Sequence, residues 1–309
     1  MTSAQPAHRR PPHRGAEPTR RRRGGFFLDG EWDAKLHRPV GSAWVRWEAP
    51  ADEGDWTAPV VLVHGGGGQS TDWLWAVDGQ PGWAELFVGA GHPTYLLDRP
   101  GHGRSVWDVE AMGPRSAVPD TTVLARLFQV DEAELRGRFG AVAASSTGLF
   151  ADAAAAQRRD AAALTRLLEL VGPAIVVTHS AGAPAGWLAA DRRPDLVDIV
   201  VAVEPLGPPR TRALTEGVTA LPLGAAGQPR GLATVPVLLV TAAASGHLQA
   251  DSETAAFLRG RGAEVEHLRL GQHGLDGDGH GVLFDRNSTA AFDLVHRHLP
   301  APARPGGGR

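Results

Sequence analysis

Short apolar runs alternate with longer Ala- and Leu-rich stretches along most of the chain. Runs of β-branched and aliphatic residues are typical of strands buried on both faces. Six follow one another, at residues 59–63, 95–97, 175–177, 199–203, 237–240 and 265–270. Apolar residues at three- and four-residue spacing predict helices over 123–139, 151–170 and 289–298. This order of strands and helices predicts an α/β fold, with helices flanking a mostly parallel central sheet of about eight strands.

The first part of the chain has a shorter period. Over residues 43–48, Ala, Val and Trp alternate with positions that include Arg46 and Glu48. A period of two is typical of antiparallel strands with one face toward solvent. We therefore expect antiparallel strands between residues 26 and 47, at the edge of the sheet.

Proline, glycine and charge indicate the limits of the folded domain. Residues 1–24 mix Pro, Gly and Arg without an apolar period, which predicts a disordered Arg/Pro-rich tail. The α/β domain is expected over 25–299, with a second disordered tail over 300–309. Within the domain, the helical stretch 106–165 exceeds one crossover helix and predicts a small cap. The Pro- and Gly-rich stretch 206–233 predicts a lid loop.

Composition narrows the classes of partner. With 309 residues and a formal net charge of -3, the folded body has no basic character that would favour nucleic acid, although seven arginines lie between Arg9 and Arg23. Cysteine is absent, so thiolate metal sites and disulfides are excluded. No run of about 18 apolar residues predicts a membrane span. No export signal follows the paired arginines. We expect a cytoplasmic protein that binds a small molecule but neither nucleic acid nor membrane, and a homodimer is compatible with the sequence.

Residues 175–182, Ile-Val-Val-Thr-His-Ser-Ala-Gly, carry the strongest chemical signal. A buried strand leads directly into a small-residue turn with one serine, and a helix-like stretch follows. Such a nucleophile elbow holds the serine on a strained bend, with its oxygen clear of the sheet. Ser180 is therefore the candidate nucleophile, and the N–H of Ala181 is a candidate oxyanion donor. The G-x-S-x-G pattern is broken at Thr178 and kept at Gly182; taken alone, the serine fits a helix N-cap as well.

Four glycines, 65–68, follow His64 at the end of the strand 59–63. They let the backbone approach a ligand closely, and their N–H groups could form the second half of an oxyanion hole. A phosphate-binding loop is the alternative, but no G-x-x-x-x-G-K-[ST] or G-x-G-x-x-G spacing follows. Asp98 ends another strand in a glycine-rich turn, and we interpret it as a residue that holds the turn.

A serine nucleophile needs a neutral imidazole as its base and a carboxylate that holds the imidazole. His280 follows the last strand between two glycines, which favours it over His273 as the base. Glu204 follows five apolar strand residues, where a buried charge needs an imidazole or N–H partner. One alternative remains open: Glu204 could serve as a cap or ion pair at the sheet edge, with Asp251 as the acid in its place. The order Ser180, Glu204, His280 is that of α/β-hydrolases.

Seven segments together resemble the esterase 713-like branch of the α/β-hydrolases, from residue 26 to residue 299. They are FFLDG at 26–30, HGG at 64–66, DGQPGW at 78–83, DRPGHGRS at 98–105, THS at 178–180, VEP at 203–205 and GLDGDGH at 274–280. In that branch a Thr-His-Ser elbow and a Glu-Pro after the sixth strand occur together. The resemblance implies an α/β-hydrolase fold and a triad of Ser180, Glu204 and His280. It also implies that Gly66 and Ala181 donate the oxyanion N–H groups.

The hypothesis is a serine carboxylesterase that uses no metal or cofactor and forms an acyl-enzyme on Ser180. With the same triad, hydrolysis of a lactone or a C–C bond, or acyl transfer to an acceptor, remains open. A non-catalytic ligand-binding protein with this fold is the alternative from a different class. Dehalogenases and epoxide hydrolases are disfavoured because they need an aspartate in place of Ser180.

Overall fold

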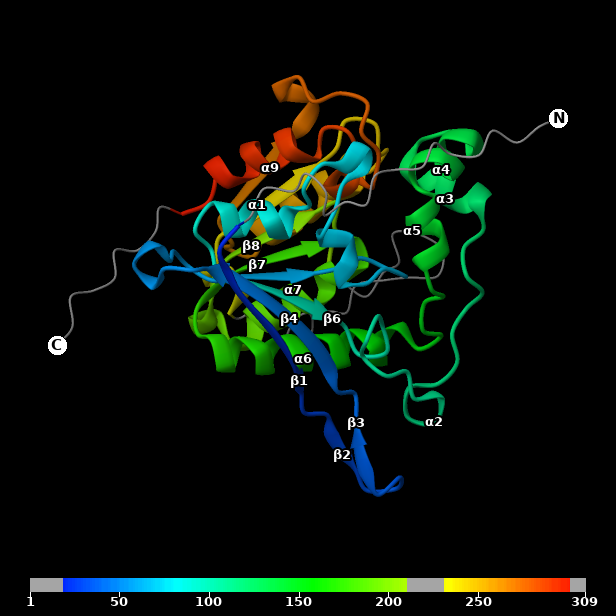
Figure 1. The fold of residues 1–309 in the computed structure, drawn as a ribbon, viewed down its shortest axis with the longest axis vertical. Coiled ribbons are helices and arrows are strands. Elements are labelled where there is room, and N and C mark those ends of the chain that lie inside the picture. Colours follow the sequence, from blue (N-terminus) through cyan, green and yellow to red (C-terminus); the bar gives the residue numbers. More distant parts are fainter. Residues whose placement is uncertain (1–18, 210–230, 301–309) are drawn as a thin grey trace.

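An eight-stranded sheet forms the centre of the computed structural model, which describes residues 19–209 and 231–300 (Figure 1). The strand order is β1-β4-β6-β5-β7-β8-β9-β10. The strands are β1 (Arg21–Leu28), β4 (Ala43–Pro50), β5 (Val60–Val63), β6 (Thr94–Asp98), β7 (Ala174–His179), β8 (Val197–Val203), β9 (Val237–Thr241) and β10 (Val265–Arg269). β1, β4 and β6 pair antiparallel, and the pairs from β6 to β10 are parallel. The expected mostly parallel sheet is thus confirmed.

Burial explains the difference in period between the two parts of the sheet. Every residue of β5 and β7 is buried, as in strands covered by helices on both faces. In β4, by contrast, Ala43 and Val45 are buried while Trp44 and Arg46 are partly exposed. The prediction of antiparallel strands between residues 26 and 47 is therefore confirmed by β1 and β4. β1 is the edge strand, and β2 (Glu31–Asp33) and β3 (Arg38–Val40) form a separate hairpin that projects from the body (Figure 1).

Helices cover both faces of the sheet (Figure 1). α6 (Ala153–Val171), α7 (Ala183–Arg192) and α8 (Leu248–Arg259) share one apolar cluster with the strands. α1 (Trp83–Gly89) and α9 (Ser288–Arg297) share the other. Because helices cover both faces of the sheet, we expect the site at the carboxyl ends of the parallel strands, as in other α/β architectures. In the described ranges, no helix has the length and apolar character needed to cross a membrane.

The stretch expected to form a cap contains short helices beside the sheet: α2 (Val109–Met112), α3 (Thr121–Phe128), α4 (Glu132–Arg138) and α5 (Gly140–Ser145). The prediction of a single helix over 123–139 is wrong, because α3 ends at Phe128 and a separate helix, α4, begins at Glu132. Gln129 adopts the left-handed conformation with φ 56°, and Asp131 then caps α4 by accepting the N–H of Glu134. Phe128 and Phe139 contact Phe284 just beyond His280, with ring centroids 5.5 and 6.0 Å apart. These helices thus pack against the loop that carries the candidate base.

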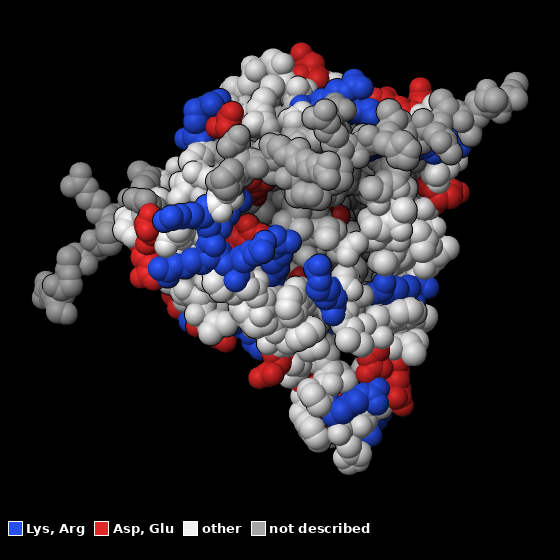
Figure 2. Space-filling model, viewed as in Figure 1, with Lys and Arg blue, Asp and Glu red and all other residues white. Residues whose placement is uncertain are grey.

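The expected boundary of the N-terminal tail at residue 24 requires correction. Arg21 to Gly24 belong to β1, which pairs with β4 along its whole length. The high charge of these residues had suggested disorder rather than a strand. Arg21 forms ion pairs with Glu48 and Glu85. Figure 2 shows basic and acidic side chains side by side on this face. The other tail predictions, over residues 1–18 and 301–309, and most of the predicted lid, over 210–230, lie outside the described residues.

Candidate active site

The turn after β7 places Ser180 on a sharp bend between strand and helix. Its φ is 50°, a left-handed conformation that is uncommon for a residue with a side chain. Gly182 makes the bend possible, because a Cβ there would lie 2.4 Å from the backbone oxygen of His64. The strand-turn-helix geometry expected of a nucleophile elbow is present.

A glycine in α7 compensates for the glycine that the elbow pattern lacks at position 178. Thr178 is completely buried, and a Cβ on Gly186 would lie 2.8 Å from its Cγ2 atom. The absence of a side chain at Gly186 in α7 therefore makes room for the Thr178 side chain in β7. This pairing explains how α7 approaches β7 closely despite the larger residue in the strand.

His280 connects Ser180 to Glu204. Its Nε2 atom lies 2.7 Å from Ser180 Oγ, and its Nδ1 atom lies 3.1 Å from Glu204 Oε2. Glu204 Oε1 accepts the backbone N–H of Ala242 at 2.6 Å. Glu204 directly follows β8 and has a φ of 49°, so both hydrogen-bond partners of the imidazole have left-handed backbone conformations after neighbouring strands. The structure thus brings together the three residues that the sequence proposed as a triad.

Burial sets the protonation of this group. It lowers the pKa of His280 to about 4, so the imidazole is neutral near pH 7 and can accept a proton from Ser180. Nδ1–H then donates to Glu204, which fixes Nε2 as the acceptor. Burial raises the pKa of Glu204 to about 7, while the neighbouring His247 and the Ala242 N–H act in the opposite direction, favouring the carboxylate.

The alternative residues occupy other positions. Asp251, on α8, accepts a hydrogen bond from Thr241 Oγ1 at 2.6 Å, and among the described residues its other oxygen has no partner. It therefore does not hold His280. His273 is exposed in the short helical turn after β10. Asp98 accepts the N–H groups of Ser70 and Arg104 at 2.7 and 3.0 Å, as a turn-holding residue should.

The glycine loop after β5 lies against the elbow. A Cβ on Gly65 would be 2.7 Å from His179 Nδ1 and 3.2 Å from Ser180 Cβ. Within 19–209 and 231–300, the N–H of Gly66 donates to no other group of the protein. Ala181 lies in the short helical turn Ser180–Gly182 that leads into α7, and N–H groups at the start of a helix lack acceptors within it. The glycine loop therefore lies beside the elbow, and the N–H groups of Gly66 and Ala181 stay the predicted oxyanion donors.

Two further histidines, which the sequence analysis did not select among the thirteen, lie beside the candidate triad. His247 packs against His280 with ring centroids 4.6 Å apart and the ring planes tilted by 34°, and its Nδ1 lies 3.7 Å from Glu204 Oε2. His179 Nε2 donates to the backbone oxygen of His280 at 2.9 Å, and burial lowers the pKa of His179 to about 3. The position of His179, directly before the candidate nucleophile, was the only available signal.

The only group of close potential metal ligands found in the described ranges consists of Glu204, His247 and His280. One ligand atom from each lies within 4.8 Å of the others. Two of these side chains already form the hydrogen-bonded chain to Ser180. The arrangement therefore fits proton transfer at Ser180 with the side chains that the protein itself supplies.

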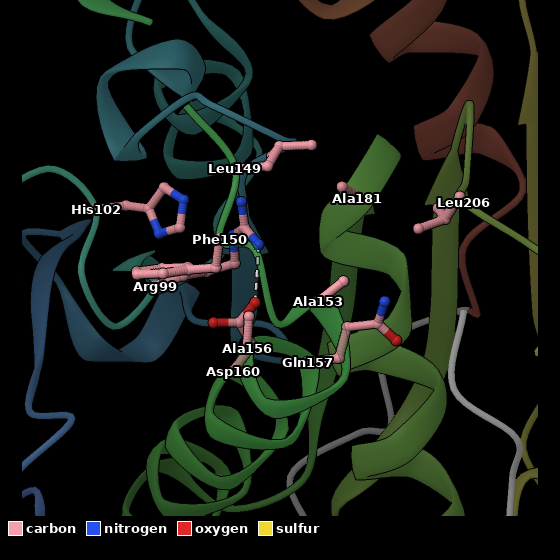
Figure 3. Close-up of a pocket in the computed structure, with 10 residues that line it drawn as sticks. All are labelled: Arg99, His102, Leu149, Phe150, Ala153, Ala156, Gln157, Asp160, Ala181 and Leu206. Atoms are coloured by element: carbon pink, nitrogen blue, oxygen red, sulfur yellow. Dashed lines mark hydrogen bonds and ion pairs between the residues drawn. The ribbon is translucent and has the colours of Figure 1, made fainter. Parts of the chain in front are cut away.

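A pocket opens beside Ala181 (Figure 3). Ala181 and Leu206 lie on one side of it, and Leu149 and Phe150 lie across from them. The N–H of Leu206 donates to the backbone oxygen of Ser180 at 2.9 Å, which fixes this wall to the elbow. The remaining lining residues are Arg99, His102, Ala153, Ala156, Gln157 and Asp160. The pocket beside the elbow is thus lined by both apolar and polar side chains.

Known proteins share this architecture. A protein named "Probable secreted lipase phiG", from Fungal sp. (strain ATCC 74256), is 29% identical over 293 residues, which cover 77% of this chain and 80% of the relative. A solved structure described as a novel bacterial esterase superposes with a TM-score of 0.69 at 21% identity, covering 91% of this chain and 96% of that one.

A second solved structure supports the same fold. A 2-hydroxy-6-oxo-6-phenylhexa-2,4-dienoate hydrolase from Rhodococcus sp. strain RHA1 superposes with a TM-score of 0.52 at 12% identity, covering 89% of this chain and 99% of that one. The sequence profile described as alpha/beta hydrolase fold matches residues 58–234, more than half of the chain. This segment includes the glycine loop, the elbow and Glu204. The chain therefore belongs to the α/β-hydrolase fold family.

Proposed function

We propose that the protein is a serine hydrolase that cleaves carboxylic esters of small molecules. The observation that carries the proposal is the continuous hydrogen-bonded chain from Ser180 through His280 to Glu204, with Ser180 on a strained turn beside a pocket. A serine used only as a helix cap needs neither a buried imidazole at 2.7 Å nor a carboxylate behind it. The names of the fungal lipase and the bacterial esterase agree with this assignment.

In the proposed reaction, His280 Nε2 removes the hydroxyl proton while Ser180 Oγ attacks the ester carbonyl. The N–H groups of Gly66 and Ala181 hold the resulting oxyanion, and Glu204 stabilises the imidazolium. His280 then gives its proton to the departing alkoxide, which leaves as the alcohol, and Ser180 retains the acyl group. Water repeats these steps by losing a proton to His280, and the carboxylic acid leaves when Ser180 recovers its proton.

Replacing Ser180 with Ala tests the proposal directly. We expect the wild type to gain the mass of one phosphonyl group from a fluorophosphonate and to hydrolyse p-nitrophenyl esters. Ser180→Ala should lose the labelling and reduce kcat by roughly 10⁶-fold, because the nucleophile is gone while the fold is retained. Intact-mass spectrometry and ester turnover measure both effects. Turnover that persists in a folded Ser180→Ala variant would show that another group carries out the reaction.

Two alternatives give different results in the same experiment. A non-catalytic ligand-binding protein needs no activated serine, so the wild type would remain unlabelled. A lactonase, C–C hydrolase or acyltransferase would be labelled but would prefer its own substrate or acceptor. The Rhodococcus neighbour, named as a hydrolase of a 2-hydroxy-6-oxo-dienoate, has the same fold. Turnover of matched ester, lactone and vinylogous diketone substrates distinguishes these reactions. The expected cytoplasmic location stays a prediction, since the fungal relative is named as a secreted protein.

A further inference from the structure

We infer that Arg99 is a positioning residue for the oxyanion hole, and that it acts by holding the carbonyls of Gly65 and Gly66. The inference rests on the proposed function, in which Gly66 supplies an oxyanion N–H. Arg99 follows β6 directly, and its side chain is 5% exposed. Its Nη2 atom donates to Gly65 O and to Gly66 O, both at 2.6 Å. One side chain thus holds two consecutive peptide groups of the glycine loop.

A buried histidine acts on the same carbonyl. The N–H of Arg99 donates to His64 Nε2 at 3.1 Å, so this ring nitrogen is an acceptor. Burial and the neighbouring Arg99 lower the pKa of His64 well below its usual range, so the ring is neutral. His64 Nδ1 must then carry the hydrogen and donate to Gly65 O, 2.9 Å away. Gly65 O therefore accepts from two fixed donors.

Peptide geometry passes this constraint to the oxyanion donor. The carbonyl of Gly65 and the N–H of Gly66 belong to one planar trans peptide, so the two groups point in opposite directions. Fixing Gly65 O on Arg99 and His64 therefore turns the N–H of Gly66 away from the guanidinium. The glycines themselves supply no such restraint, because glycine has the widest choice of backbone conformations. Without the clamp, which consists of the two hydrogen bonds from Arg99 Nη2, the Gly65–Gly66 peptide would be held by His64 alone.

Asp160 holds the clamp in place from α6. Its Oδ2 accepts Arg99 Nη1 at 2.8 Å, and its side chain is 4% exposed. Figure 3 shows this ion pair at the edge of the pocket beside Phe150. Both nitrogens of the guanidinium fork are thereby engaged, one by the carboxylate and the other by the loop. A lysine has a single nitrogen on a flexible stem and does not reproduce this fork.

The decisive variant removes both charges together. Arg99→Met alone would leave Asp160 charged and buried without a partner, whereas replacing a buried ion pair by apolar residues of similar volume is often neutral for stability. We therefore compare the wild type with the double variant Arg99→Met/Asp160→Leu. Arg159→Met is the matched control, because Arg159 also donates to a backbone oxygen, that of Ala111 at 2.7 Å, but not in the glycine loop.

With a p-nitrophenyl ester, the double variant should lose about 10²-fold or more in kcat, the loss expected when one oxyanion donor fails. KM should stay within about twofold, because the clamp acts on the transition state. The inhibition constant of a trifluoromethyl ketone, which forms an oxyanion on Ser180, should rise in proportion. The pH profile should keep its shape, since His280 is untouched. Arg159→Met should retain wild-type kcat, and Arg99→Lys should show an intermediate loss.

The outcomes separate the clamp from the proposed function. A folded double variant with wild-type kcat, or with a change in KM alone, overturns the clamp while leaving the esterase assignment intact. A wild type without labelling or turnover overturns the assignment itself. The crystal structure of the double variant then supplies an independent readout: a rotated Gly65–Gly66 peptide supports the clamp, and an unchanged peptide overturns it. If the double variant does not fold, Arg99→Lys carries the same comparison, and unchanged kcat in that variant overturns the clamp.

Discussion

Ser180 and Glu204 share an unusual backbone conformation. Their φ angles are 50° and 49°, in a region that costs a non-glycine residue on the order of 1–3 kcal/mol. Each residue directly follows a parallel strand, β7 or β8, and each hydrogen bonds to His280. The strain is thus located at the two residues that must leave the sheet to reach one imidazole.

Replacing Glu204 with Gln should reduce kcat by roughly 10³- to 10⁴-fold. Glu204 accepts two N–H groups, those of Ala242 and His280 Nδ1, with two oxygens. Glutamine has only one oxygen, so its amide would oppose one of these donors and favour the wrong orientation of the ring. Ester turnover of the purified variant measures the loss. Asp251→Asn is the control and should keep wild-type kcat; an equal loss in both variants would move the acid to Asp251 or leave it unassigned.

Asp251 should give the protein a specific pH dependence of stability. Burial, with Glu204 nearby, raises its pKa from 3.8 to about 8, so the folded protein keeps a proton that the unfolded chain releases. Since the folded pKa is the higher one, the contribution of Asp251 to stability is lost as pH rises from about 4 to about 8. Asp251→Asn cannot ionise, so its Tm should exceed that of the wild type by more at pH 8 than at pH 5. Thermal unfolding at both values tests this, and an equal difference at the two values contradicts it.

At the level of elements, the close contact of α7 with β7 positions the elbow. The contact depends on one pair, Gly186 in the helix and Thr178 in the strand, because a Cβ on Gly186 would lie 2.8 Å from Thr178 Cγ2. Helix and strand are both rigid here, and Thr178 is completely buried. A methyl group added at Gly186 would push α7 away from β7 and so shift Ser180, which lies in the turn between them.

Gly186→Ala should therefore destabilise the protein by about 1–3 kcal/mol, the usual cost of overpacking a core. Thr178→Ser removes the obstructing methyl group while keeping the hydroxyl, so the double variant should recover much of that loss. Urea unfolding of the wild type, both single variants and the double variant gives the coupling free energy. Additive effects would show that the two side chains do not compete for this space.

At the scale of the whole molecule, an aromatic cluster joins the short helices α3 to α5 to the candidate site. Phe284 is buried and contacts Phe128 at the end of α3 and Phe139 between α4 and α5, and its ring centroid lies 6.5 Å from that of His179 beside the candidate nucleophile. It follows His280 by four residues in the same loop. The position of the candidate base therefore depends on packing between segments that are distant in sequence.

Phe284→Ala should cost about 3–5 kcal/mol of stability and also lower kcat/KM, because the loop of His280 loses its support. Phe292→Ala is the matched control: Phe292 is as deeply buried, but it packs on Trp83 and Phe87 between α9 and α1, away from the site. Denaturant unfolding and ester turnover per folded protein measure the two effects. Equal turnover of both variants would show that the cluster stabilises the fold without positioning His280.

The apolar pattern and the order of polar residues along the chain were enough to predict the sheet and the candidate triad. Fully apolar strands are readable because burial on both faces leaves no polar position, and Glu204 stood out because a charge after such a strand needs a partner. Chain order then selected His280. The break at Gln129 and the strand formed by Arg21 to Gly24 were missed, since local composition contained neither the cap of α4 nor the acidic partners on other segments.

The residues that support the candidate triad could be identified only from the packed structure. The contact of His247 with His280, the close approach of Gly186 to Thr178, and the hydrogen bonds from Arg99 to the glycine loop all join segments that are far apart in sequence or on different elements. No local pattern encodes them, because each depends on the distance and direction between two side chains after the sheet has formed. The sequence thus specified the chemical groups, whereas folding specified their geometry.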